Sequence, residues 1–233
     1  MEYVVKKNKR KLKRDVNKVF SNNLNKILTE IILNADDSYK RLEQVTNDDT
    51  VKPIIIDINR KKKVISICDY AEGMSETDIR TIFTDYGGVH NKRQASSVRG
   101  LFGQGASDVL FYGAQAARLG KIESIKNGEM SICKFIIGDE QKIKVDTVSN
   151  KQQIKNFKDK HKIIENGTVV TFGLGDKVSI PYKKNLKHKI ESFYMLRYVL
   201  SDSKRKVIIQ HDKIKEVLDS NKFIPNAKAL VLE

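Results

Sequence analysis

The fold of this chain depends on the stretch Thr29-Glu30-Ile31-Ile32-Leu33-Asn34-Ala35-Asp36-Asp37-Ser38. At about 100° per residue in a helix, Glu30, Asn34 and Asp37 fall on one narrow strip, and apolar residues share the neighbouring arc. A carboxylate and an amide one turn apart can serve as a general base and a metal ligand. The same strip is also typical of a solvated helix face, so its meaning depends on the stretches that follow.

Length and charge limit the classes of protein to consider. A chain of 233 residues fits one large domain, or one domain plus a fragment, and can bury a substantial core. The 44 basic and 29 acidic residues give a net charge of +15, which favours anionic partners such as nucleotides, nucleic acid or an acidic membrane surface. A lysine-rich solvated surface explains the same excess equally well. Much of it lies in one run, residues 6–14.

The two cysteines, Cys68 and Cys133, predict neither a disulfide framework nor a metal site. No apolar run approaches the length of a membrane span, and the charged N-terminus lacks the apolar segment of a secretory signal. We therefore expect a soluble cytoplasmic protein with no membrane partner.

The first half of the chain predicts a helix followed by a hairpin. Helical periodicity extends from about Asp15 to Gln44, and two β-branched runs, 54–58 and 64–68, flank a polar turn. Asp69 ends the second strand and could accept a hydrogen bond from an exocyclic amine, although an Asp there more often caps a turn. Ser75 to Asp78 then predicts a capping box that opens a short helix through Phe83.

A glycine-rich loop precedes the next helix. Gly100-Leu101-Phe102-Gly103-Gln104-Gly105 leads directly into the apolar run 106–117. Glycines before a helix expose backbone amides and a helix dipole to an anion, so this loop could hold a triphosphate. It fits neither the dinucleotide fingerprint nor a Walker A loop, which ends in Gly-Lys-Ser/Thr.

The second half alternates predicted strands with one insertion and one helix. Asn127-Gly128 is the strongest hairpin signal in the chain. Residues 149–165 look like a charged insertion, and the last five residues resemble a strand cut short, as expected in a fragment of a longer polypeptide. The expected elements are strands at 121–126, 129–137, 142–147, 166–172 and 207–209, and one amphipathic helix from Leu186 to Leu200 with a basic opposite face.

Four short motifs follow one another along the chain: Glu30-x-x-x-Asn34-Ala35, Asp69-x-x-x-Gly73, Gly100-x-x-Gly103-x-Gly105 and Gly167-Thr168. Each is weak alone, but taken in order they resemble those of the GHKL ATPases, the superfamily of gyrase B subunits, ninety-kilodalton heat-shock chaperones, histidine kinases, MutL and MORC proteins. The resemblance is nearest to the hydrolysing branch and covers roughly residues 15–210. It implies an α/β (α+β two-layer) Bergerat fold, a mixed but mostly antiparallel sheet with helices on one face and a mobile ATP lid at about 84–105.

The resemblance also implies a role for each motif residue. Glu30 would activate the attacking water, Asn34 would hold Mg²⁺, and Asp69 would accept from the adenine amine with support from Thr168. Asp37 is given a lesser, structural role. The implied nucleotide-binding residues are Asn34, Asp69, Gly73, Met74, Gly100, Leu101, Phe102, Gly103, Gln104, Gly105 and Thr168.

Two departures from the family pattern stand out. Ala71 replaces the usual glycine in the second motif. In several members of the family the next domain supplies a cation to the γ-phosphate, and we expect this chain to lack that domain. We expect residues 1–14 to form a basic arm, 15–210 the ATP-binding domain, and 211–233 an extension.

The expected function is slow Mg²⁺-dependent ATP hydrolysis. A carboxylate at Glu30 favours hydrolysis over phosphotransfer, because histidine kinases commonly carry Asn there. Lid closure and ATP-dependent homodimerisation would control an appended or partner effector, in nucleic-acid transactions or defence. Two alternatives stay open, a non-hydrolysing nucleotide-binding module and a basic nucleic-acid-binding domain. The scarcity of aromatics and the lack of a base-reading motif count against the second.

Overall fold

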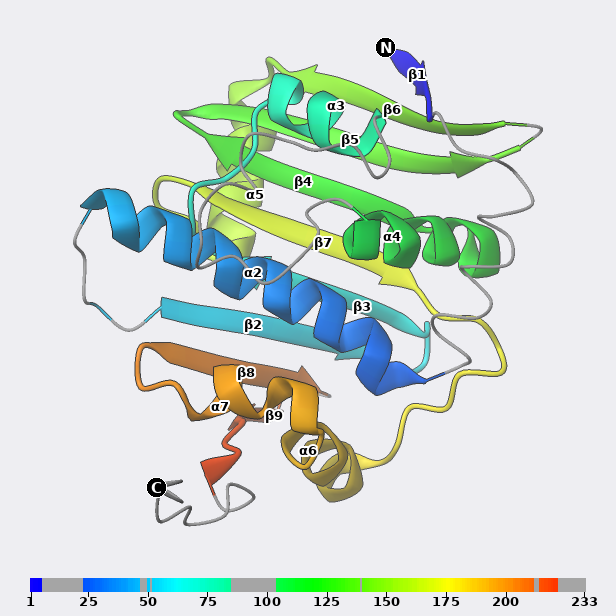
Figure 1. Cartoon of the computed structure of the whole chain (residues 1–233). Helices are drawn as coiled ribbons and strands as arrows, with labels where there is room; N and C mark the ends of the chain where they lie inside the picture. The colour runs from blue at the N-terminus through cyan, green and yellow to red at the C-terminus, as the bar shows by residue number, and fades with distance from the viewer. Residues whose placement is uncertain are drawn as a thin grey trace, which may run out of the picture.

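The computed structural model describes residues 1–5, 23–46, 50, 52–84, 104–138, 140–211 and 214–221. Within these residues the chain forms one mixed sheet of nine strands in the order β1-β6-β5-β4-β7-β3-β2-β8-β9 (Figure 1). Neighbouring strands are antiparallel except β2 and β8, which are parallel. The strands are β1 Glu2–Val4, β2 Lys52–Asn59, β3 Val64–Asp69, β4 Gly120–Lys126, β5 Glu129–Ile137, β6 Gln141–Val148, β7 Gly167–Gly173, β8 Arg205–His211 and β9 Ile214–Val217.

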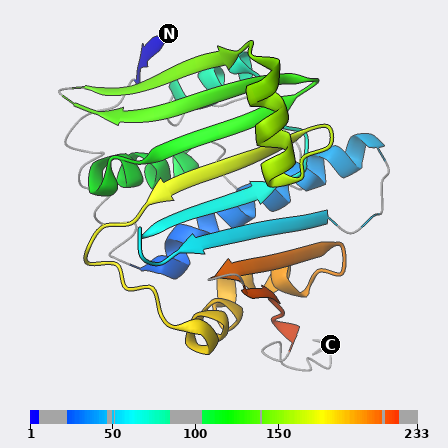
Figure 2. The same ribbon diagram turned by 180° about the vertical axis from the view of Figure 1, so that it is seen from behind.

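Helices cover both faces of the sheet. The front face in Figure 1 carries α2 (Leu24–Thr46), α3 (Glu76–Thr84), α4 (Gln104–Ala117), α6 (Lys183–Glu191), the 3₁₀ helix η2 (Tyr194–Leu196) and α7 (Arg197–Ser201). The helix α5 (Lys151–His161) lies on the opposite face, as the reverse view in Figure 2 shows. The expectation of helices on one face alone was therefore wrong.

The apolar arc of α2 packs on the sheet as its periodicity predicts. Leu24, Ile27, Leu28 and Ile32 are at most 1% exposed, and they join the core formed by the inward-facing isoleucines of β2. On the other face, Phe157 of α5 covers a separate small cluster that includes Cys68 and Val169. Because strand side chains alternate between faces, adjacent residues such as Ile67 and Cys68 belong to different clusters.

Two local predictions are confirmed in detail. Asn127 and Gly128, with φ of 51° and 83°, form the tight turn between β4 and β5. Ser75 Oγ accepts a hydrogen bond from the Asp78 amide at 3.2 Å, and Asp78 Oδ2 accepts one from the Ser75 amide at 3.1 Å. This reciprocal capping box opens α3, as expected.

Two other predictions differ from the structure. Part of the supposed insertion at 149–165 is the helix α5, capped by Asn150 Oδ1, which accepts from the Gln153 amide at 3.0 Å. The single helix expected from Leu186 to Leu200 is broken, because Phe193 leaves helical geometry with ψ at 114°. Apolar periodicity continues through the break because both segments bury residues against the same core.

The sheet also reaches beyond the expected limits of the ATP-binding domain. β1, inside the predicted arm 1–14, pairs with β6, and β9, inside the predicted extension 211–233, pairs with β8. The N-terminal ammonium donates to the Val145 carbonyl at 2.9 Å, which ties the chain end to β6. Among the described helices, none has the length and apolar character needed to cross a membrane.

Candidate functional site

A pocket between α2 and the sheet brings together residues from three of the four motifs. Asn34 comes from α2, Asp69 from the end of β3, Met74 from the following loop, and Thr168 from β7. Asp69 and Thr168 are direct partners in the β3–β7 ladder, although 99 positions separate them. The full lining is Ile31, Asn34, Ala35, Ser38, Arg41, Ile67, Asp69, Glu72, Met74, Ile82, Phe83, Ala106, Ile122, Thr168 and Val170.

Asp69 is the buried acid of this pocket. It is 8% exposed, and its Oδ1 accepts a hydrogen bond from the Ala71 amide at 3.1 Å. Burial raises the pKa of Asp69 to about 7, and the nearby Glu72 carboxylate adds to this shift. Backbone hydrogen bonds from Ala71 and Thr168 and the positive charge of Arg41 oppose the shift only in part. Burying a carboxylate without an ion-pair partner destabilises the fold. Acids with pKa values raised in this way are common at binding and catalytic sites.

A hydroxyl network supports the Asp69 side of the pocket. Ser124 of β4 is fully buried, and its Oγ accepts from the Met74 amide at 2.8 Å and donates to the Gly167 carbonyl at 3.1 Å. Thr168 Oγ1 lies 2.9 Å from the same oxygen. Ser124 and Thr168 are partners in the β4–β7 ladder. Sequence reasoning missed Ser124, because a lone serine in a strand gives no signal of its contacts.

Gly73 has a structural reason to be glycine. Its φ is +66°, and a Cβ on it would overlap the carbonyl of Ile125 in β4. The glycine therefore allows the loop after β3 to cross β4 closely and set Met74 at the pocket. Gly73 itself does not line the pocket.

An ion pair in the wall of the pocket was not foreseen. Arg41 Nη2 lies 2.7 Å from Glu72 Oε1, and Arg41 Nε donates to the same oxygen at 2.8 Å. Asn34, Ser38 and Arg41 follow helical spacing along one side of α2, so the polar strip continues through Ser38 and Arg41. The helical spacing of Ser38 and Arg41 could have been predicted from the sequence, whereas the pairing of Arg41 with Glu72 could not. Asp37, placed on the strip by sequence, is fully buried and does not line the pocket.

Glu30 lies one turn before Asn34, at the junction of α2 with α4. It is half-buried and is not among the lining residues. A Cβ on Gly105, in the first turn of α4, would overlap the Glu30 Oε2 atom, so the two residues are in close contact. Burial raises the pKa of Glu30, and the Asp108 carboxylate of α4 raises it further. A raised pKa suits a carboxyl group that takes up a proton near neutral pH.

The rest of the glycine motif is only partly described. Gly100, Leu101, Phe102 and Gly103 lie outside the described residues, as does nearly all of the expected lid at 84–105. The helix after the glycines is confirmed, and it begins at Gln104, two residues earlier than expected. No group of three or more His, Cys, Asp or Glu within the described ranges could hold a metal ion.

No known protein-family model and no curated protein sequence matches the chain. The case for a function therefore depends on the pocket. Its wall is mostly apolar, with a buried acid and a threonine on the sheet side and an amide on the helix side. Such a site can accept a flat, partly polar ring beside a hydrogen-bonded acid.

Proposed function

We propose that this chain is a cytoplasmic ATPase of the GHKL type, with a Bergerat fold, that binds ATP in the pocket and hydrolyses it slowly. The observation that supports this most is the convergence of Asn34, Asp69, Met74 and Thr168 on one pocket. These residues come from three stretches that lie far apart in the sequence and are linked there only by their resemblance to GHKL motifs. A solvated helix face would not lie over a buried acid.

In this proposal Asp69 reads the base. Its carboxylate accepts a hydrogen bond from the exocyclic amine, and the apolar side chains of Ile31, Ile67 and Val170 contact the ring. The free volume among the lining side chains is about 60 Å³, smaller than the roughly 300 Å³ of the smallest typical ligand sites. A nucleotide therefore has to shift side chains at the entrance, and the flexible Met74 is suited to this.

The phosphates would lie toward Glu30 and the start of α4. Glu30 takes the proton of the attacking water, and Gly105 keeps space for its carboxylate. The oxygen donors here, the Asn34 amide and nearby carboxyl groups, match the preference of Mg²⁺, which would neutralise charge on the phosphates. The lid motion and ATP-dependent homodimer that would control an effector rest on the resemblance alone.

Thermal melts with and without Mg-ATP test the proposal. At 100 times its dissociation constant, the nucleotide should stabilise the parent chain by about 2.7 kcal/mol. Asp69→Asn should lose this effect, whereas Asp57→Asn, an exposed acid on β2, should keep it. A well-folded parent chain with no shift would refute the proposal.

One observation favours a second candidate, a module that binds nucleotide without hydrolysing it. Glu30, the proposed base, is not among the residues that line the pocket. Phosphate release by the parent chain that disappears in Glu30→Gln, with the ATP-induced shift retained, would support the ATPase. No phosphate release by the parent chain or by Glu129→Gln, an exposed control, together with a retained ATP-induced shift, would support the non-hydrolysing module.

A further inference from the structure

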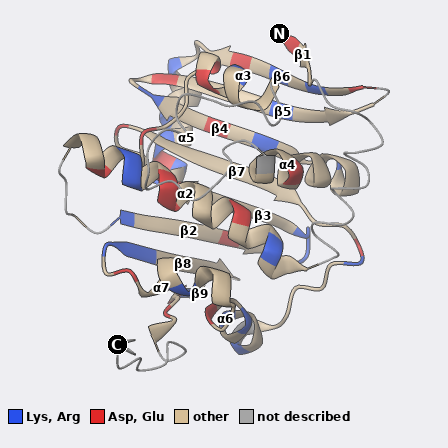
Figure 3. Ribbon diagram, viewed as in Figure 1, with Lys and Arg blue, Asp and Glu red and all other residues tan. Residues whose placement is uncertain are grey.

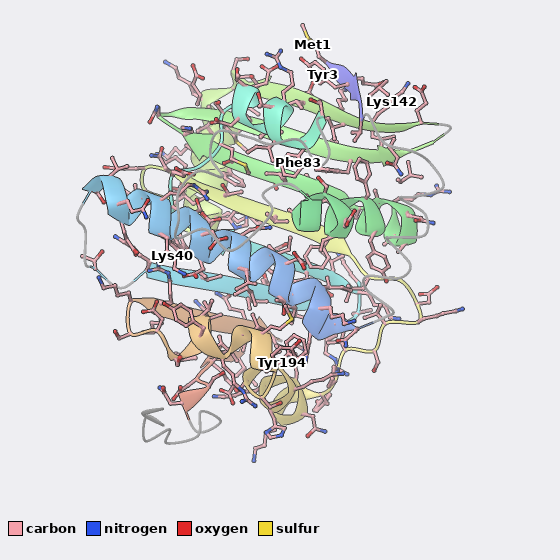
Figure 4. All side chains as sticks on the ribbon, viewed as in Figure 1. Met1, Tyr3, Lys40, Phe83, Lys142 and Tyr194 are labelled. Carbon is pink, nitrogen blue, oxygen red and sulfur yellow. The ribbon has the colours of Figure 1, made fainter. Side chains whose placement is uncertain are left out.

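All three exposed aromatic side chains in the described part of the chain lie between residues 182 and 198. Tyr182, Tyr194 and Tyr198 are 60%, 70% and 62% exposed. Tyr182 directly precedes α6, Tyr194 lies in η2 and Tyr198 lies in α7. The other described tyrosines and phenylalanines are buried or half-buried. Figure 4 labels Tyr194 and Lys40 on the face of the sheet that carries α2. We name residues 182–198, with Lys40 and Arg60, the tyrosine–lysine surface.

Cations lie over two of these rings. The guanidinium carbon of Arg60 lies 4.7 Å from the centre of the Tyr182 ring, and Lys40 Nζ lies 5.0 Å from that of Tyr198. Arg60 also donates to the Ile180 carbonyl at 3.2 Å, which fixes it beside Tyr182. Each of these two rings is thus held at the surface beside a cation, of which Lys40 is also paired with Asp36 at 2.8 Å.

The formal charge along residues 177–198 is almost all positive, although Asp176 lines the adjoining groove and Glu216 pairs with Lys187. Residues 177–198 contain six Lys or Arg and one acid, Glu191. Glu191 is 1% exposed and accepts a hydrogen bond from the Asp219 amide, so it offers little negative charge to a partner. Figure 3 shows basic residues on α6 and at the turn between β2 and β3. A groove of about 440 Å³ beside Tyr182 is lined by Arg60, Lys61, Lys63, Asp176, Lys177, Val178, Ser179 and Ile180.

Protein interfaces and nucleic-acid interfaces make different use of these residue types. Both use Tyr and Arg, but Lys is depleted at protein interfaces and abundant where a backbone of phosphates is bound. Exposed aromatic rings bordered by cations suit unpaired bases, which stack on the rings while phosphates contact the lysines. We propose that the tyrosine–lysine surface binds single-stranded nucleic acid. This site is separate from the pocket and does not depend on the proposed ATPase.

Fluorescence anisotropy with a labelled oligothymidylate tests the stacking. The double variant Tyr194→Ala/Tyr198→Ala should bind at least about 10-fold more weakly than the parent, because each base stacked on a ring contributes to affinity. The matched variant Tyr194→Phe/Tyr198→Phe keeps both rings and should bind like the parent. Since these side chains are exposed, both variants should have the same melting temperature as the parent chain.

A second pair of variants tests the charge. Lys184→Gln/Lys189→Gln removes two exposed cations from α6, and Lys155→Gln/Lys160→Gln removes two from α5 on the opposite face. If each α6 lysine contacts one phosphate, the slope of log affinity against log salt concentration should be less steep by about 1.4 in the first variant. The α5 variant should leave this slope unchanged.

Two results would overturn the proposal. One is equal binding by the parent chain and the Tyr→Ala variant. The other is equal loss of binding from the α6 and α5 lysine variants, which would indicate a diffuse charge effect. Asp69→Asn should bind the oligonucleotide normally, so failure of the ATP site and failure of this surface remain distinguishable.

Discussion

Two buried carboxylates near α2 have opposite environments. Asp36, fully buried, receives Arg205 Nε at 2.6 Å on one oxygen and Lys40 Nζ at 2.8 Å on the other. Asp69, across the helix, accepts the Ala71 amide, and burial raises its pKa to about 7. The first carboxylate is compensated within the protein, and the second largely is not.

This difference in ion pairing distinguishes a structural acid, Asp36, from a candidate binding residue, Asp69. Arg205 also binds Glu43 through two hydrogen bonds of 2.5 and 3.0 Å, so the Asp36 cluster joins α2 to the start of β8. Within the residues that the structure describes, Asp69 makes no ion pair, and Arg41, whose charge lowers the pKa of Asp69, is itself paired with Glu72. An acid that the fold pairs completely stabilises an interface, whereas one left with spare acceptor capacity in a pocket can bind a ligand.

The largest expected effect concerns the compensated carboxylate. Arg205→Ala should destabilise the chain by about 3–5 kcal/mol, because it leaves Asp36 and Glu43 without their shared partner. Urea unfolding measures this loss. Arg80 is an exposed arginine on α3 whose guanidinium carbon lies 5.7 Å from the centre of the Tyr3 ring, so Arg80→Ala should change stability by less than about 1 kcal/mol. An Arg205 variant as stable as the Arg80 control would remove the contrast between the two carboxylates.

Asp69→Asn should have the opposite effect. The folded pKa of Asp69 is raised from 3.8 to about 7, so the folded state holds a proton that the unfolded state has lost, and stability falls as pH rises between these values. Asn carries no charge to bury, so the variant should be more stable than the parent by roughly 2–4 kcal/mol at pH 8 and by little at pH 4. Urea unfolding at both pH values measures the difference. A variant less stable than the parent at pH 8 would show that the Asp69 carboxylate is compensated after all.

Nucleotide affinity should follow the reverse trend with pH. A deprotonated Asp69 is the better acceptor for an exocyclic amine, so ATP affinity should fall by up to about 10-fold per pH unit below pH 7. Calorimetric titration of Mg-ATP at pH 8 and pH 6 measures this change. GTP, which presents a carbonyl where ATP has its amine, serves as the control. Affinity for ATP that does not change with pH would separate Asp69 from base recognition.

How much of this could be predicted depends on the range of each interaction. Local chemistry was sufficient for the Asn127-Gly128 hairpin and the Ser75–Asp78 capping box, because each is formed by neighbours in sequence. The helix α5 was missed because its only buried side chain is Phe157, which gives a weak periodic signal in a charged stretch. The break in the helix after Leu186 was missed because the apolar spacing continues through Phe193, where the backbone leaves the helical conformation.

The candidate site shows the same division. The order of the motifs indicated that Asn34, Asp69 and Thr168 share a pocket, and their assembly through the β3–β7 register agrees with that expectation. The pairs Arg41–Glu72 and Arg205–Asp36 were missed, because charged residues 31 and 169 positions apart carry no mark of their partner. Only their contacts therefore distinguish the paired Asp36 from the buried Asp69 of the pocket.

The smallest expected change in stability comes from Gly105, which lies against the third acid near α2. An alanine there gains helix propensity of up to about 1 kcal/mol, and its methyl group meets the movable end of the Glu30 side chain. Gly105→Ala should thus melt near the parent chain. Gly113→Ala, on the same helix, should lose stability, because its methyl group would overlap the Leu119 carbonyl of the backbone.

The effect of Gly105→Ala on catalysis should be much larger than its effect on stability. The methyl group displaces the Glu30 carboxylate, and a shift of about 1 Å in a catalytic group can reduce turnover roughly 100-fold. The ATP-induced thermal shift should persist, because Asp69 and Thr168 do not contact the substituted residue. Phosphate release and thermal melts measure the two properties side by side. Turnover equal to that of the parent would mean that the Glu30 carboxylate is not the base, and the acid at this junction would then belong with Asp36 among the structural ones.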